Sequence, residues 1–257
     1  MVSENAFAAI QIDVAQMREA GLEELVGQRV YARIGDRSEN LAEMLHSVDG
    51  LHFELKIDQR RIRTGVVVIR ADWTNANLDR ALHALIREPR GVGTDTYEGR
   101  IRTLMRSNPS TVIFGDSEDV RAVPTPPPHL QWPGTAAVRG SFRRSTATEA
   151  IFRMLLGEGS SEHGEFRLDV SSEGARLAVE LATDDREALL EHAHASKQTW
   201  PMRVDVATVM LFPGVRDLLE TVEIELIPEG VRWTTSLTHD QTEMVWTQVV
   251  HAIPLRL

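Results

Sequence analysis

The sequence predicts an α+β protein of duplicated β-α-β-β-α units, whose antiparallel sheets carry helices packed on one face, arranged as two similar halves. Two observations lead to this prediction. Residues 164–195 read as two alternating strands, a Glu-Gly turn and a helix, and residues 221–250 repeat that pattern without a gap. A proline-rich segment also divides the chain near its middle. Strands that are apolar at every second residue are typical of antiparallel sheets with one covered face.

The two gapless copies share residue types at each step of the pattern. Glu-Gly marks the turn at 173–174 and again at 229–230, where glycine supplies the positive φ that a tight connection needs. Asp184 and Asp240 follow the second strand of each copy, and each is expected to cap a helix that returns its apolar stripe to the sheet.

A third copy spans residues 51–86 and needs a short gap. Its first strand alternates apolar and polar residues, a polar turn follows, and residues 66–69 form the return strand. Asp72 or Asn75 is expected to cap the next helix. A strand-then-helix segment precedes each copy and completes the unit.

Residues 96–123 extend the first half. They predict two strands around an Asn-Pro turn and a short final helix, which Asp116 or Ser117 is expected to cap. The segment RGVGTDTYEGR, residues 90–100, is expected to end a helix and form a loop, because its glycines follow a helix instead of opening one.

Five prolines between residues 121 and 134 cannot run through a helix or a central strand. They predict an extended connector over residues 124–134. The connector separates an N-terminal α+β half (1–123) from a C-terminal α+β half (135–257).

Composition narrows the function classes. The net charge of −10 and the pI near 5.4 disfavour nucleic acid as a partner, and no apolar stretch is long enough for a transmembrane segment. The chain has no cysteine, which excludes disulfides and thiolate metal sites. The start lacks a basic segment followed by an apolar one, so the chain as it stands is expected to be cytoplasmic. It would be periplasmic or envelope-associated if a leader had been removed.

Motifs for catalysis are weak. The sequence contains neither G-x-S-x-G nor a phosphate loop, and its histidines lack metal-ligand spacing, so we expect no cofactor and no metal. A hydrolase with a dispersed active site around Arg100, Asp116 and His163 is the alternative to a binding protein.

Candidate binding residues come from three places. Arg139 and Arg143 are four residues apart on a predicted strand. Because side chains alternate between faces with a period of two, both lie on one face, which could meet an anionic partner. Trp132 in the connector and Trp200 before Pro201 are expected in loops, where tryptophan either plugs a core or marks a recognition surface. Tyr97 and Arg100, both in the segment TYEGR, complete the set.

Three segments of the N-terminal half form a further pattern. They are AFAAIQIDVAQMREAGLEELV (residues 6–26), TYEGR (96–100) and TVIFGDSEDVRAV (111–123). In these patterns, over residues 5–123, the chain resembles a loose group of exported proteins and lipoproteins of myxobacteria and related bacteria. In that group a strand and helix open the mature domain. The resemblance implies export, with Met1 standing where a leader or a lipid-attached cysteine once was, and it brings no known activity.

The leading hypothesis is therefore a non-enzymatic binding protein. It would carry a small apolar ligand such as a lipid between sheet and helices. Otherwise it would dock another protein through a sheet edge or the Trp132 connector, and that protein could be a second copy of the same chain in a homodimer. The two acidic halves also look superficially like a sliding DNA clamp. That hypothesis is disfavoured, because the helices that would line the hole offer only Arg153 as a cation.

Overall fold

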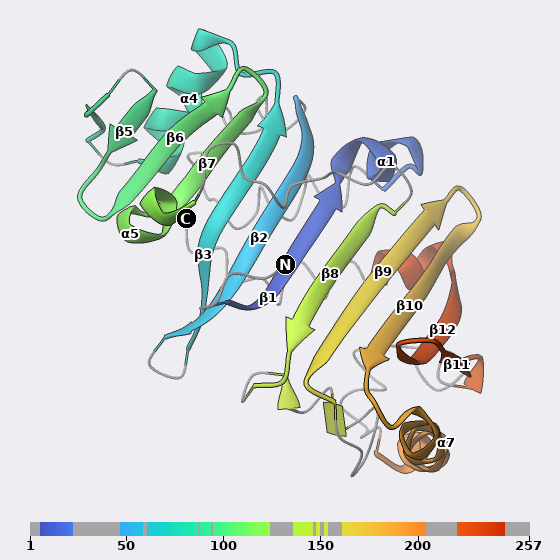
Figure 1. Cartoon of the computed structure of the whole chain (residues 1–257). Coiled ribbons are helices and arrows are strands. Elements are labelled where there is room, and N and C mark those ends of the chain that lie inside the picture. Colours follow the sequence, from blue (N-terminus) through green and yellow to red (C-terminus); the bar gives the residue numbers. More distant parts are fainter. Residues whose placement is uncertain are drawn as a thin grey trace. The chain divides into compact units, whose positions relative to one another are not determined.

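A computed structural model describes residues 6–22, 47–58, 61–86, 88–93, 95–123, 136–145, 148–149, 152–153, 161–203 and 220–244. The chain divides into two compact units: unit 1 comprises residues 1–135 and 247–257, and unit 2 comprises residues 136–246. Each unit combines an antiparallel sheet with a few helices, which confirms the predicted α+β class (Figure 1).

Unit 1 contains an antiparallel sheet in the order β1-β2-β3-β7-β6-β5-β4. Its strands are β1 (Ala6–Asp13), β2 (Val48–Asp58), β3 (Arg61–Ala71), β4 (Arg90–Gly91), β5 (Thr96–Glu98), β6 (Arg102–Asn108) and β7 (Thr111–Asp116). Its described helices are α1 (Val14–Glu19), α4 (Asn75–Leu85) and α5 (Ser117–Ala122). The Asn-Pro turn joins β6 to β7 as predicted, but the glycine-rich segment that was expected to be a loop includes the short strand β4, which pairs with β5.

Both faces of β3 are buried, whereas the sequence predicted one covered face. Val66 and Val68 pack with Val120 of α5 on one side. Val67 and Ile69 alternate with them and are buried on the other side. A continuous apolar run of this kind is typical of a strand covered on both faces.

Unit 2 contains five antiparallel sheet strands in the order β11-β12-β10-β9-β8. Its elements are β8 (Val138–Arg143), β9 (His163–Ser171), β10 (Gly174–Ala182), α7 (Arg186–Arg203), β11 (Glu223–Ile227) and β12 (Gly230–Thr238). The two gapless hairpin patterns of the sequence form β9–β10 and β11–β12, and a helix follows the first. β11 is the outermost strand at one end of this described sheet, and its Leu226 is 44% exposed.

Two glycines fix how closely the strands of unit 2 approach. A Cβ on Gly174 would lie 2.1 Å from the carbonyl oxygen of Leu237, and one on Gly230 would lie 1.9 Å from that of Leu181. Gly174 also has a φ of +148°, which disfavours other residues. The same prediction of a positive φ was wrong for Gly230, which is required for its close approach alone. The Glu-Gly turn signals therefore mark close backbone contacts between neighbouring strands.

The helix caps of unit 1 differ from the prediction. Thr74, instead of Asp72 or Asn75, caps α4: its Oγ1 accepts a hydrogen bond from the Asn77 N–H at 3.2 Å. Asp116 precedes α5 as expected, but its side chain makes no capping hydrogen bond. The cap is the residue just before the first helical turn, and only a side chain there reaches the free N–H groups.

The caps of unit 2 also shift by one or two residues. Asp185, instead of Asp184, accepts a hydrogen bond at 3.2 Å from the N–H three residues on. After β12, the hydroxyl of Thr238 accepts from the Gln241 N–H, and the Gln241 side chain accepts from the Thr238 N–H. This reciprocal pair is a capping box and replaces the cap expected at Asp240.

Trp200 lies in a helix, and the prediction of a loop there was wrong. The helix α7 continues through Pro201 to its end at Arg203, and Trp200 is 2% exposed. Proline in the last turn removes one backbone hydrogen bond, and burial of the large indole offsets that loss.

Candidate functional site

Charged side chains collect on one face of the sheet in unit 2. Successive residues of a strand point to opposite faces, so the strand register determines which side chains share a face. On one face lie the mostly apolar residues of each strand, including the buried Leu181, Val231 and Trp233. The other face, here called the charged face, carries Arg139, Ser141, Arg143, His163, Glu165, Arg167, Asp169, Arg176, Ala178, Glu180, Glu223, Glu225, Arg232, Thr234 and Ser236.

The register arranges the charged face in rows that cross the five strands. The first row, from β8 to β11, consists of Arg139, Arg167, Ala178, Thr234 and Glu223. The second row consists of Ser141, Glu165, Glu180, Arg232 and Glu225. Side chains in one row are direct neighbours, about 5 Å apart between adjacent strands.

Ion pairs organise the middle of the charged face. The Nε of Arg232 donates to Glu180 at 2.7 Å, and its Nη1 donates to Glu225 at 3.0 Å. Hydrogen bonds to Glu180 first, and then to Glu225, raise the pKa of Arg232 above its ordinary value, which keeps this guanidinium charged. Arg167 and Asp169 form a further pair along β9 at 2.8 Å. The charges therefore have defined positions on the face.

The charge also changes sign across the face. At the β8 side, Arg139 and Arg143 are half-buried cations. At the β11 side, Glu223 and Glu225 are exposed anions. This polarity gives the face an orientation that a partner can recognise.

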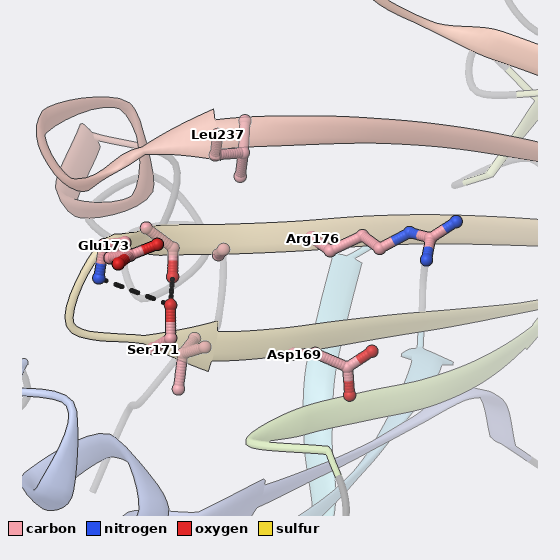
Figure 2. Close-up of a pocket in the computed structure, with 8 residues that line it drawn as sticks. Asp169, Ser171, Glu173, Arg176 and Leu237 are labelled. Carbon is pink, nitrogen blue, oxygen red and sulfur yellow. Dashed lines mark hydrogen bonds between the residues drawn. The ribbon is translucent and has the colours of Figure 1, made fainter.

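An open hollow of about 300 Å³ lies at the tip of the β9–β10 hairpin (Figure 2). Charged and apolar side chains surround it: Asp169, Val170, Ser171, Glu173, Gly174, Ala175, Arg176 and Leu237. The Ser171 hydroxyl accepts from the Glu173 N–H and donates to the Gly174 carbonyl, both at 3.3 Å, which closes the turn. Of its lining residues, Asp169 and Arg176 belong to the charged face, whereas Val170, Ala175 and Leu237 belong to the opposite face.

The structure places the predicted binding residues in separate parts of the chain. Arg139 and Arg143 lie in β8 on the charged face, whereas Trp200 is buried in α7. Tyr97, half-buried in β5, and Arg100, exposed after it, belong to unit 1. Trp132 and the connector lie outside the described residues.

The residues of the hydrolase hypothesis are also divided between the units. Arg100 and Asp116 are exposed residues of unit 1, and His163 is an exposed residue of unit 2. In the ranges that the structure describes, no three acidic or histidine side chains gather into a group that could hold a metal ion. Among the described helices, none is both long enough and apolar enough to cross a membrane.

A buried polar stripe on β2 was missed by the sequence reasoning. His52 and Glu54 are only 3% and 5% exposed, with Nε2 of the histidine 3.7 Å from Oε1 of the glutamate. Further along the strand, Lys56 forms an ion pair with Asp119 of α5. The signal was present as polar residues at every second position of LHFELKID, but alternation alone assigned them to a solvent face.

Comparisons with known proteins identify a related fold. No protein-family model matches the chain, and no curated protein matches its sequence. Solved structures described as crystal forms I, III and IV of TP0453 are similar to it, with TM-scores of 0.57, 0.55 and 0.52 at 12% sequence identity. These matches cover 97%, 97% and 96% of this chain and 95%, 96% and 94% of the other. The chain therefore shares its fold with TP0453 over nearly its whole length.

Proposed function

We propose that the protein is a non-enzymatic binding protein that docks a protein partner through the charged face of unit 2. The observation that carries this proposal is the arrangement of five arginines and five carboxylates on one face of the described sheet, with opposite signs at its two sides. Complementary charge patterns of this kind select a partner and set its orientation.

The size and regularity of the charged face support a macromolecular partner. Five strands about 4.8 Å apart place the outer two strands about 19 Å from each other, which is wider than a small ligand needs. The hollow at the hairpin tip has Asp169 and Arg176 of this surface in its lining, and a side chain of the partner would enter it there.

Internal duplication is part of the proposal. In both hairpins of unit 2, two residues connect the strands. In both, a glycine begins the second strand and lies against a leucine carbonyl of a neighbouring strand: Gly174 against Leu237, and Gly230 against Leu181. These shared details support the view that one hairpin unit was copied. Copying a hairpin widens the sheet and thus the face available for binding.

We also propose that the protein acts at the bacterial envelope. The resemblance to exported proteins favours the bacterial envelope, where a docking protein would hold its partner near the membrane. A carrier of a small apolar ligand is the competing function, and the experiment below separates the two.

Native mass spectrometry of the protein purified gently from its own organism tests the proposal. We expect the mass of a second protein chain in the native spectrum, released on denaturation. A released mass of a few hundred daltons, with no protein partner, would instead support the ligand carrier.

Charge-swap variants connect the partner to the face. Exchanging the exposed Glu165 and Arg176 (E165R with R176E) keeps the net charge but reverses two positions of the charged face. We expect this variant to lose the partner. The matched control exchanges the exposed Asp72 and Arg90 of unit 1 and is expected to retain it. Equal retention by both variants would contradict docking through the charged face.

A further inference from the structure

The charged face of unit 2 is complementary to itself. We infer that its partner is a second copy of this chain, bound face to face about a two-fold axis parallel to the strands. This inference rests on the proposed function, because it uses the same face, and it adds the identity and orientation of the partner.

The strand order determines which strands would meet in such a pair. In the described order β11-β12-β10-β9-β8, the middle strand is β10. A two-fold axis that runs above β10 and parallel to it reverses the strand order in the second copy. It therefore places β8 over β11 of the second copy and β9 over β12, each contact occurring twice.

The same axis keeps each row of side chains above the same row of the second copy. In the first row, Arg139 then lies over Glu223 of the second copy. In the second row, Glu165 lies over Arg232 of the second copy. Because the axis generates each contact twice, four pairs of opposite charge form between two identical faces.

Two charged residues of β10, Arg176 and Glu180, would each meet their own counterpart at the axis, so two contacts between like charges oppose the four pairs of opposite charge. Ala178, at the centre of the first row, has a small side chain that allows close approach. Glu180, at the centre of the second row, lies 2.7 Å from Arg232 of its own chain, and this same guanidinium would face Glu165 of the second copy.

The other face-to-face orientation is disfavoured by charge. A two-fold axis perpendicular to the strands and midway between the two rows would lay β11 over β11. It would place Glu223 near Glu225 of the second copy and Arg167 near Glu165 of the second copy. Like charges at such distances are destabilising. Its two favourable and two unfavourable contacts cancel, whereas the axis parallel to the strands forms four favourable and two unfavourable contacts, so the charge pattern favours the parallel axis.

The contact area predicts a weak dimer. Strands of up to nine residues and a width of five strands give roughly 600 Å² of sheet per copy. Stable complexes bury about 800 Å² on each partner, so this contact is at the low end. Its charge pairs are also screened by salt. Arg139 already interacts within its own chain, and the pair with Glu223 would be an additional contact.

Sedimentation velocity of the full chain over a range of concentrations tests the inference. We expect a monomer–dimer equilibrium at low salt that shifts to monomer by 10-fold or more in affinity as salt rises to about 0.5 M. A wild-type chain that stays monomeric at every concentration and low salt would overturn the inference. It would leave the proposed function intact if a different protein partner is still found.

Two single variants make the test specific. R139E would repel Glu223 of its own second copy, and E223R would repel Arg139, so each variant alone is expected to be monomeric. In an equimolar mixture, Glu at 139 of one chain meets Arg at 223 of the other, and the remaining contact is the native pair. The mixture is therefore expected to form heterodimers, which native mass spectrometry separates by mass.

The controls separate misfolding from lost contacts. Circular dichroism and thermal unfolding of each variant must match the wild type, and E165R serves as an independent variant, because it would face Arg232 and is also expected to be monomeric. Dimerisation of either single variant at the wild-type strength would contradict this geometry. Failure of two folded variants to form heterodimers on mixing would also contradict it.

Discussion

The guanidinium of Arg144 binds the carboxylate of Glu149 through two parallel hydrogen bonds, from Nε at 2.9 Å and from Nη2 at 3.0 Å. Arg153 adds a third hydrogen bond at 3.1 Å, one helical turn away. The hydrogen bond from Arg144, more than any other effect, lowers the pKa of Glu149 from 4.5 to about 2. The pair connects the end of β8 to the helical segment that follows.

This pair predicts a stability contribution that depends on pH. Because the pKa of Glu149 is lower in the folded chain, its contribution is fully present above about pH 4.5 and is lost as the pH falls toward 2. Thermal unfolding of the wild type and of Glu149→Gln should therefore differ at pH 7 and converge between pH 4.5 and 2. Glu191→Gln, an exposed change on α7, is the control, and an equal response of the two variants would contradict the prediction.

Glycine at the start of β10 and β12 should be indispensable. Gly174→Ala and Gly230→Ala place a methyl group about 2 Å from a carbonyl oxygen of the neighbouring strand, where no real contact can exist. Each is expected to lower the free energy of unfolding by about 3 kcal/mol, as measured by urea denaturation. Gly91→Ala, where an added Cβ meets nothing within 4 Å, is the matched control, and an equal loss there would refute the explanation.

The cap of α7 should be Asp185 and not its neighbour. Asp185→Ala removes the acceptor for the free N–H of the first turn and is expected to cost about 1 kcal/mol in urea denaturation. Asp184→Ala leaves that hydrogen bond in place and should change the free energy of unfolding by less than about 0.5 kcal/mol. The reverse order of effects would mean that α7 begins one residue earlier.

The ion pair between Lys56 and Asp119 should couple β2 to α5. Both side chains are mostly buried, so their attraction is less screened than that of a surface pair. A double-mutant cycle with Lys56→Met and Asp119→Asn is expected to give a coupling of about 1 kcal/mol. Additive effects of the two changes would show that the pair does not stabilise the unit.

Local patterns predicted much of this fold. Alternation and the turn signals at Gly174 and Gly230 located the hairpins of unit 2, because the strand period and the glycine requirement are properties of a few adjacent residues. The Asn-Pro turn likewise located the connection between β6 and β7. These features depend little on the rest of the chain.

Features that depend on distant residues were not predictable from those patterns. His52 and Glu54 alternate with apolar neighbours as on a solvent face, yet they are buried, because coverage of the second face is decided by tertiary packing. Trp200 was assigned to a loop from the adjacent proline, while its burial depends on the surrounding core. The rows of the charged face required the register of five strands, so only Arg139 and Arg143 were anticipated.

The outermost strand β11 has a consequence for how the protein behaves when it is concentrated. An open strand edge can template the addition of further chains and lead to fibres. Glu223 and Glu225 on this short strand, the outermost of the described order, would repel the same strand of another molecule. We therefore expect the two carboxylates to disfavour edge-to-edge extension when the protein is concentrated.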